Sequence, residues 1–332
     1  MTPEGVIWQA APILGMDLGG TKIAAILVDA ADEPIASISV PTDGRPLGEQ
    51  LVDAARRALD KAGAEYRPAA IGIGAPGQVD SEAGVLRLAV NLAAADVPIT
   101  SIVEGALGIP CFLEHDAHAA AAWLDGRRPT GSLAYLSVGT GISAAVVIDG
   151  RPLRGARGMA GEIGHLVAVE NGPICACGLQ GCLEAVAAGP AIARQASARI
   201  AAGEATSLPA NADARAVYQA AAGGDQLALS IAESVGRYLA RAIRGVVLAY
   251  GVERVVIGGG LSRAGAPFLD PILRELDRER QSSRLALQAL PRDLIELLPP
   301  DTDAGARGAV VIARSGLRAA ARHRGQREVD DG

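Results

Sequence analysis

Apolar residues along the chain follow two alternating patterns, which together predict an α/β fold. Residues 13–28 and 133–148 each contain two apolar runs joined by a glycine turn, the pattern of a β-hairpin. Short continuous apolar runs indicate buried strands, and apolar residues at helical spacing indicate amphipathic helices. Because strands and helices alternate, we expect mainly parallel sheets. Strands are predicted at 69–77, 109–113, 252–260 and 294–298, and helices at 48–63, 116–124, several places within 185–250, 267–280 and from about 304.

The two predicted hairpins share a plan that suggests an internal duplication. Aligned without a gap at a constant offset of 120 positions, residues 13–29 and 133–149 have four identities over seventeen positions. We therefore expect two duplicated α/β domains, a smaller one over 1–117 and a larger one over 118–303. The final helix, about 304–321, is expected to pack back on the first domain, and the polar tail 322–332 to be disordered. The identical pairs are Gly19 and Gly139, Ala24 and Ala144, Ala25 and Ala145, and Asp29 and Asp149.

Composition and charge argue against several classes of protein. The chain has 332 residues and a net charge of −6 without a basic stripe, so nucleic acid and anionic membranes are poor partners. Four cysteines in this length are too few for a secreted disulfide framework. The first residues lack the basic and apolar regions of a signal peptide, and no apolar run reaches the roughly 18 residues that span a bilayer. We expect a cytoplasmic protein in a reducing compartment.

Three glycine-rich turns at strand ends predict a nucleotide site. Glycines let backbone N–H groups approach a phosphate, Thr and Lys add a donor and a charge, and Asp can hold Mg²⁺ through water. Each turn alone could be an ordinary tight turn, but two of the three lie in matching hairpins. The residues concerned are Asp17, Gly19, Gly20, Thr21 and Lys22 in the first turn, Gly139, Thr140 and Gly141 in the second, and Gly258, Gly259 and Gly260 in the third.

Asp116 stands where a predicted strand meets a predicted helix. An aspartate at such a place is often simply the N-cap of the helix. It is also well placed to accept a proton from a substrate hydroxyl. The residues alone leave both roles open.

The segment 161–185 has the composition of a structural zinc site. One imidazole and three thiolates suit tetrahedral zinc and leave no position for a reacting water, while the alternative is a set of unligated buried thiols. A loop fixed by zinc could hold Glu162 and Glu184 toward a sugar, although their spacing also fits surface glutamates. The four candidate ligands are His165, Cys175, Cys177 and Cys182.

Together these motifs resemble the ROK family (repressors, open reading frames and kinases) from about residue 13 to about residue 315. The resemblance rests on Asp17–Lys22, Gly74–Gly77, Asp116, Glu162–His165 and Cys175–Glu184. It implies an actin-like ATPase (ribonuclease H-like) fold, with two duplicated α/β domains around a nucleotide and sugar cleft. It also implies a structural Zn²⁺ and the phosphorylation of a hexose at its 6-hydroxyl, with Mg²⁺ and ATP.

The resemblance assigns roles residue by residue. The two hairpin turns match the ATP phosphate motifs, and Gly258–Gly260 match the adenosine motif. Asp116 matches the general base. The positions that match sugar-binding residues are Gly77, Asn91, His115, Asp116, Glu162, His165 and Glu184, with His165 doubling as a zinc ligand.

Two positions depart from the family pattern. His115 stands where an Asn normally hydrogen-bonds the sugar ring, and Ala94 stands where an aromatic residue usually follows Asn91. The phosphate motifs are intact, so the resemblance implies a glucokinase-like, ATP-dependent sugar kinase whose acceptor is open. The alternative acceptors are modified sugars of antibiotic pathways, either an aminohexose such as kanosamine or a C7 cyclitol.

Other members of the family are sugar-responsive repressors. They carry a helix-turn-helix domain of several dozen residues before the first hairpin, where this sequence has about a dozen residues. A non-catalytic sugar-binding regulator is the less favoured alternative, because Asp116 and Lys22 are both present. The expected partners are a small-molecule sugar and ATP, and the expected assembly is a homodimer or homotetramer.

Overall fold

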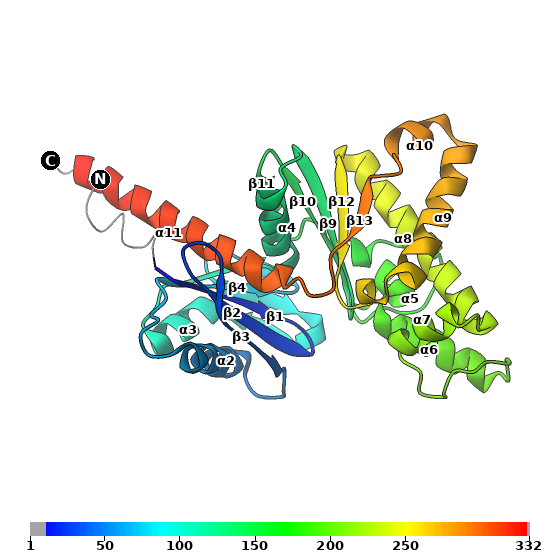
Figure 1. Cartoon of the computed structure of the whole chain (residues 1–332), viewed down its shortest axis with the longest axis horizontal. Coiled ribbons are helices and arrows are strands. Elements are labelled where there is room, and N and C mark those ends of the chain that lie inside the picture. Colours follow the sequence, from blue (N-terminus) through cyan, green and yellow to red (C-terminus); the bar gives the residue numbers. More distant parts are fainter. Residues whose placement is uncertain (1–10, 331–332) are drawn as a thin grey trace. The chain divides into compact units, whose positions relative to one another are not determined.

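Figure 1 shows the chain as a computed structural model, which describes the backbone of residues 11–330 and the side chains of residues 11–322. The chain divides into two compact units. Unit 1 contains the described residues up to Arg128, the segment Arg154–Ala160 and the residues from Asp303 onward. Unit 2 contains Pro129–Leu153 and Gly161–Thr302.

A five-stranded sheet with the order β3-β2-β1-β4-β8 forms the centre of unit 1. β1 and β2 form an antiparallel hairpin, and β3 extends it antiparallel to β2. β4 runs parallel to β1, and β8 runs parallel to β4, so the carboxyl ends of three strands meet at one edge. The strands are β1 (Ile13–Leu18), β2 (Lys22–Val28), β3 (Pro34–Pro41), β4 (Ala70–Ala75) and β8 (Cys111–His115).

Helices cover both faces of this sheet (Figure 1). On one face, α2 and α3 pack in a core that includes Leu14, Met16 and Ile73. On the other face, α11 packs against Ile13 and Val28. Residues 13 and 14 thus point to opposite layers, as the alternation of side chains along a strand requires. The helices of unit 1 are α2 (Leu47–Ala62), α3 (Ile99–Leu107), α4 (Asp116–Arg127) and α11 (Ala304–Asp330).

A small antiparallel sheet with the order β5-β6-β7 completes unit 1. Its strands have only three to five residues, too few for a periodic pattern to reveal them in the sequence. The elements are β5 (Gln78–Asp80), β6 (Val85–Ala89), the 3₁₀ turn η1 (Val90–Leu92) and β7 (Ala94–Val97).

Helix α11 approaches the sheet closely because glycines stand at the points of contact. A Cβ added at Gly72 would lie 1.8 Å from a carbonyl oxygen of α11, and one added at Gly15 would lie 2.1 Å from another. α11 also contacts α4 at Gly308, where a Cβ would lie 2.3 Å from the carbonyl group of Ala119. Such distances exclude any side chain, so backbone packs directly on backbone along this layer.

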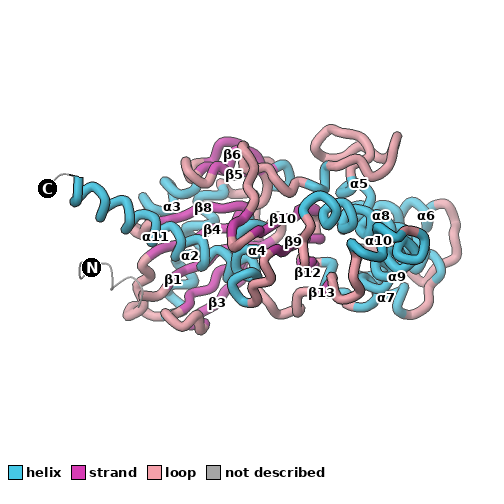
Figure 2. The backbone as a smooth tube through the Cα atoms, turned by 90° about the horizontal axis from the view of Figure 1, so that it is seen from above, coloured by secondary structure: helices cyan, strands magenta, loops and turns pink. Residues whose placement is uncertain are grey.

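Unit 2 has a five-stranded sheet of the same plan, with the order β11-β10-β9-β12-β13. β9 and β10 form the second predicted hairpin, and β12 and β13 continue the sheet in parallel with β9. The core lies where helices α5–α9 pack with this sheet, and Figure 2 shows these helices gathered beside it. The strands are β9 (Ser132–Val138), β10 (Ile142–Ile148), β11 (Arg151–Pro152), β12 (Arg254–Gly258) and β13 (Ile295–Leu297). The helices are η2 (Ile163–His165), α5 (Leu183–Ala187), α6 (Gly189–Ala201), α7 (Ala214–Ala222), α8 (Gln226–Tyr250), η3 (Leu261–Ala264), α9 (Ala266–Ser282) and α10 (Arg284–Ala289).

The two hairpins predicted from the sequence are confirmed, and β2 and β10 begin 120 positions apart, at Lys22 and Ile142. The expectation of mainly parallel sheets is wrong. Each five-stranded sheet has two antiparallel and two parallel pairings. Strands joined by a tight turn must run antiparallel, so a fold that opens each half with a hairpin has mixed sheets.

Unit 1 includes all of α4, whereas the boundary expected from the sequence lies between residues 117 and 118. α11 belongs to unit 1, where the helix at 304–321 is expected. This helix continues to Asp330, through most of the tail 322–332 for which the sequence predicts disorder, and residues 331–332 lie outside the described residues. Within residues 11–330, the helices are too short or too polar to cross a membrane.

The backbone contact between α11 and α4 makes a prediction about stability. Gly308→Ala should lower the free energy of unfolding by about 1–3 kcal/mol, the usual cost of overpacking, because its Cβ cannot fit against Ala119. Gly245→Ala in α8 is the matched control, since a Cβ there meets nothing within 4 Å. In an exposed helix interior that change should instead stabilise by up to about 1 kcal/mol. Urea unfolding measures the free energy of unfolding of both variants. A Gly308→Ala variant as stable as the wild type would contradict the close contact.

Candidate functional site

The first candidate phosphate turn joins β1 to β2 in unit 1. The N–H of Gly19 donates to the carbonyl of Lys22 over 2.9 Å, and the hydroxyl of Thr42 donates to the carbonyl of Gly19 over 2.9 Å. These bonds close the turn and leave Gly20, Thr21 and Lys22 exposed at its tip. The tip therefore offers backbone N–H groups and an ammonium group in the arrangement that a phosphate requires.

Asp17 lies just before this turn, near the carboxyl end of β1. Burial and then the charge of Asp116 raise the pKa of Asp17 from 3.8 to about 7, with a smaller contribution from Asp303, while Lys22 opposes the increase. Its carboxylate also lies against the first turn of α11, because a Cβ added at Gly305 would be 2.4 Å from its Oδ2. A carboxylate whose charge is poorly compensated is well suited to a hydrated divalent cation.

Asp116 and His115 lie where β8 meets α4. His115 is the N-cap of the helix, since its Nδ1 accepts the N–H of Ala117 over 3.2 Å. Asp116 is the first helical residue, and its Oδ1 lies 3.2 Å from the same Nδ1 of His115. Gly74 of β4 lets the chain pass close by, since a Cβ there would lie 3.3 Å from the Cα of Asp116. Oδ1 of Asp116 also accepts the N–H of Ala117, over 2.6 Å, so His115 is the N-cap residue but both side chains share this donor.

Two further predicted sugar residues of unit 1 lie beside the strands of the small sheet, Gly77 just before β5 and Asn91 on η1 between β6 and β7. Gly77 has φ +86°, and a Cβ there would lie 2.3 Å from the carbonyl oxygen of Leu88, so the position accepts only glycine without strain. Asn91 is exposed on η1, and Ala93 after it is left-handed, with φ +49°. The backbone conformation therefore restricts position 77 to glycine and places Asn91 two residues before a left-handed turn.

Unit 2 carries the second candidate phosphate turn between β9 and β10. The N–H of Gly139 donates to the carbonyl of Gly141 over 2.9 Å, and Thr140 is exposed at the tip. The N–H of Gly189, at the start of α6, donates to the carbonyl of Gly139 over 2.8 Å. The turn is therefore built like the first one, with the N-terminus of a 13-residue helix attached.

The glycines of the third motif, Gly258–Gly260, pack on the end of β9. Gly259 has φ +87°, and a Cβ there would lie 2.5 Å from the carbonyl oxygen of Val138. A Cβ at Gly258 would lie 2.5 Å from the hydroxyl of Tyr135. This stretch therefore brings backbone close to the second phosphate turn, as a nucleotide site requires.

The four predicted metal ligands come together in unit 2. Their ligand atoms all lie within 4.8 Å of one another. The Sγ of Cys175 is 3.8 Å from Nδ1 of His165, and the Sγ of Cys177 is 3.8 Å from that of Cys182. Tetrahedral zinc with Zn–S bonds of about 2.3 Å separates its sulfur ligands by about 3.8 Å. The donors and their spacing fit such an ion.

The two predicted sugar glutamates of unit 2 have different surroundings. An oxygen of Glu162 lies 3.8 Å from Nε2 of His165, on the opposite side of the imidazole from the cysteines. Glu184 accepts the N–H of Ile142 over 2.9 Å, just after the second phosphate turn. Glu162 therefore belongs with the cysteine cluster, and Glu184 links that segment to β10.

Comparisons with known proteins decide the family. The family model described as "ROK family" matches residues 13–315. The chain belongs to the ROK family. The resemblance drawn from the motifs is thereby confirmed, and so is the actin-like ATPase fold.

Individual ROK proteins share about a third of their residues with this chain. It is 33% identical over 279 residues to a glucokinase of Halalkalibacterium halodurans, an alignment that covers 80% of this chain and 84% of that protein. It is 32% identical over 263 residues to an N-acetylmannosamine kinase of Shigella flexneri, covering 76% and 84%. A ROK glucokinase structure from Streptomyces griseus, in complex with glucose and AMPPNP, has a TM-score of 0.79 and 29% identity, and covers 92% of this chain and 100% of that one.

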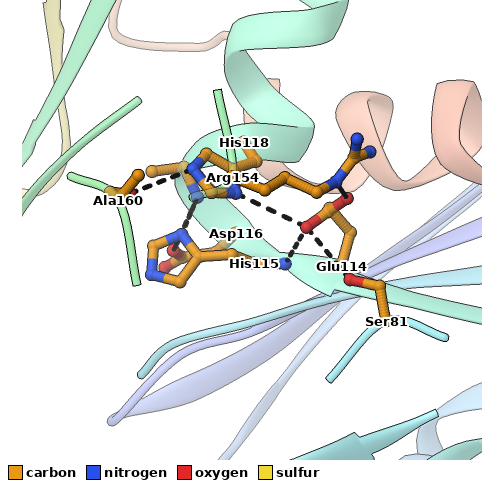
Figure 3. Close-up of polar contacts among 8 residues, drawn as sticks. Ser81, Glu114, His115, Asp116, His118, Arg154 and Ala160 are labelled. Carbon is orange, nitrogen blue, oxygen red and sulfur yellow. Dashed lines mark hydrogen bonds and ion pairs between the residues drawn. The ribbon is translucent and has the colours of Figure 1, made fainter. Parts of the chain in front are cut away.

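This ROK chain also contains a polar network in unit 1 that the sequence motifs do not reveal (Figure 3). Glu114, whose side chain is 3% exposed, contacts Nε of Arg154 over 2.6 Å and lies 3.5 Å from Nδ1 of His118. Ser81 donates to the same carboxylate over 3.2 Å, and Nε2 of His118 contacts the carbonyl of Ala160 over 3.1 Å. Glu114 and His118 are four residues apart, a spacing that could have indicated their contact from the sequence. Arg154 lies 40 positions from Glu114, so no sequence pattern connects these two residues.

The network makes the stability of unit 1 depend on pH. Burial alone would raise the pKa of Glu114, but the hydrogen bond from His118 and the charge of Arg154 lower it from 4.5 to about 2. The folded state favours the ionised form, so this stabilisation, on the order of 3 kcal/mol, is present above about pH 5 and lost as the pH falls toward 2. Glu114→Gln should therefore be less stable than wild type at pH 7, by an amount that shrinks between pH 5 and pH 3.

Urea unfolding at several pH values measures this difference. Glu82→Gln, at an exposed position one residue from Ser81, removes the same charge and is the control. A difference between Glu114→Gln and wild type that stays constant with pH would show that the carboxylate charge does not stabilise the fold.

Proposed function

We propose that this chain, an ATP-dependent sugar kinase of the ROK family, transfers the γ-phosphate of ATP to the 6-hydroxyl of a hexose, with Asp116 as general base. The main support is that Asp17 and Asp116 lie at the same edge of the sheet of unit 1, where the charge of Asp116 contributes to the raised pKa of Asp17. Asp17 ends β1 and Asp116 follows β8, so both lie at the carboxyl ends of parallel strands. One edge of the sheet thus holds a candidate base and a candidate carboxylate for hydrated Mg²⁺.

The geometry gives these residues distinct tasks. Phosphoryl transfer depends mainly on positioning and on neutralising the phosphate charge. Lys22 and the N–H groups of the first glycine turn would supply charge and donors to the phosphates, and Asp17 would hold Mg²⁺ through water. The described contacts of Asp116 engage Oδ1, which leaves Oδ2 to receive the proton of the attacking hydroxyl.

His115 bears on the choice of acceptor. Nδ1 of His115 lies 3.2 Å from both the N–H of Ala117 and Oδ1 of Asp116, and its imidazole presents a larger planar ring in other directions than the amide of an Asn would. The similarity to a glucokinase and to an N-acetylmannosamine kinase supports a neutral hexose over an aminohexose such as kanosamine.

The cluster of His165 and three cysteines is proposed to bind one structural Zn²⁺. The ion would join η2 to the segment that leads into α5, and its ligation by Nδ1 would leave Nε2 of His165 to donate toward Glu162. Glu162 and Glu184 would then accept hydrogen bonds from sugar hydroxyls. A cytoplasmic location and a homodimer or homotetramer remain predictions from the sequence.

The function is tested by ADP release in a panel of acceptors: glucose, mannose, N-acetylmannosamine, kanosamine and a C7 cyclitol. Glucose or another neutral hexose is expected to be the best substrate. Analysis of the product should place the phosphate on the 6-hydroxyl. Sugar-independent ADP release, or none with any acceptor, would contradict a sugar kinase of this specificity.

Asp116→Asn should lower kcat on the best sugar by roughly 10²- to 10⁴-fold, the usual contribution of general acid–base catalysis, while the KM for ATP changes little. The substitution keeps the size of the side chain and removes its basicity. Asp60→Asn removes the same charge from an exposed position of α2 and should leave kcat unchanged. A near-normal kcat for Asp116→Asn would assign the proton to another group.

Metal analysis should find about one equivalent of zinc per chain, as expected for a four-ligand structural site. Cys182→Ala should lose the zinc and lower Tm, because it removes a buried ligand. Cys111→Ala, at the buried cysteine outside the cluster, should keep it. Zinc-free wild-type protein, with a Tm that added zinc does not change, would contradict the site.

A further inference from the structure

The segment Arg154–Ala160, termed the strap below, is a piece of unit 1 inserted into the sequence of unit 2. The chain leaves unit 2 after Leu153 and returns to it at Gly161. Only Gly161 separates the strap from Glu162, the first of the two proposed sugar glutamates.

The strap is a closed loop. The N–H of Ala160 donates to the carbonyl of Arg154 over 3.1 Å, so its two ends are bonded together. Gly155 and Gly158 have φ values of +70° and +67°, which let the backbone turn within seven residues. A Cβ at Gly158 would lie 2.5 Å from the carbonyl oxygen of Val79, so the loop lies directly on the backbone of β5. The strap is therefore a defined element of unit 1.

Two side chains of unit 1 hold the two ends of the strap (Figure 3). Glu114 pairs with Arg154 at the first end, with Oε2 2.6 Å from Nε. His118 contacts the carbonyl of Ala160 at the other end through Nε2. Glu114 and His118 are four residues apart and lie on either side of His115 and Asp116. The junction that carries the proposed base thus also holds the strap.

The contacts at the two ends of the strap lie next to each other. Both ring nitrogens of His118 face acceptors, the carbonyl of Ala160 and the carboxylate of Glu114 at 3.5 Å. Glu114 is almost fully buried, whereas the side chain of Arg154 is 47% exposed. Removing Arg154 would leave a buried carboxylate with less compensation, which is unfavourable. The ion pair is therefore the contact that holds the first end of the strap on unit 1.

The peptide that follows the strap is fixed on its other side by unit 2. The carbonyl of Gly161 accepts the N–H of Ala144 in β10 over 2.7 Å. Gly161 has φ +100°, and a Cβ there would lie 1.8 Å from the carbonyl oxygen of Ala144. The link between Ala160 and Gly161 is thus held by His118 at one end and by a strand at the other.

We propose that the pair formed by Glu114 and Arg154 is a positioning clamp for sugar binding: by fixing the strap, it fixes the backbone from which Glu162 projects. The proposal rests on the proposed function, since it takes Glu162 as a sugar ligand. Arg154 acts through the strap and does not itself contact the sugar. Loss of the clamp should weaken sugar binding while leaving the binding of ATP as it is.

The test compares Arg154→Gln with Arg157→Gln. Both remove one positive charge from the strap, but Arg157 is exposed and lies outside the Glu114 network. Arg154→Gln should raise the KM for the best sugar roughly 10-fold, since small displacements of a positioning group have effects of this size, and leave the KM for ATP unchanged. Arg157→Gln should leave both values at wild-type level, and Arg154→Lys should restore part of the sugar affinity. Equal sugar KM values for the two Gln variants would overturn the clamp.

A double variant tests whether Glu114 and Arg154 act as a pair. Glu114→Gln with Arg154→Gln should affect the sugar KM no more than either change alone, whereas independent effects would multiply and contradict a pair. Hydrogen exchange of the strap amides gives a readout without catalysis, and exchange at Ala160 should be faster in Arg154→Gln than in Arg157→Gln. If no acceptor supports ADP release, the proposed function fails, and this exchange comparison alone decides whether the strap is clamped.

Discussion

The direct packing of α11 on the sheet and on α4 is the contact on which unit 1 depends. Gly15, Gly72 and Gly308 remove the side chains that would otherwise separate the backbones. The same packing brings Gly305, in the first turn of α11, against the carboxylate of Asp17. Helix α11 therefore forms part of the surroundings of Asp17, although Asp17 lies in β1, far away in the sequence. The burial that raises the pKa of Asp17 thus depends on the packing of α11.

The β8–α4 junction combines chemistry and architecture within residues 114–118. His115 and Asp116 are the proposed acceptor contact and base, while Glu114 and His118 hold the strap. A buried carboxylate destabilises a fold unless it is compensated, so the presence of Glu114 requires partners that bring other segments to it. Holding the strap and supplying the proposed base are consequently two roles of one short segment.

Sequence patterns predict those features whose deciding residues lie close together. Both hairpins, the glycine turns and the group of Cys175, Cys177 and Cys182 fall in this class, and the family match confirms the fold they imply. The pairing of Glu114 with Arg154 spans 40 positions, and no periodicity connects them, so it emerges only from tertiary packing. The small sheet was not predicted because its strands are too short to show a periodic pattern. Catalytic and sugar-binding roles rest on the resemblance and stay predictions.

The discontinuity of unit 1 has a consequence for synthesis of the chain. Its sheet is complete once Arg128 has been made, yet α11 follows only after all of unit 2. At about 5 to 20 residues per second, the ribosome needs roughly 9 to 35 seconds to cover that distance. Throughout this interval the apolar face that includes Ile13 and Val28 lacks its cover. During synthesis, one apolar face of the sheet is therefore exposed and prone to aggregation until α11 has been made and packs on it.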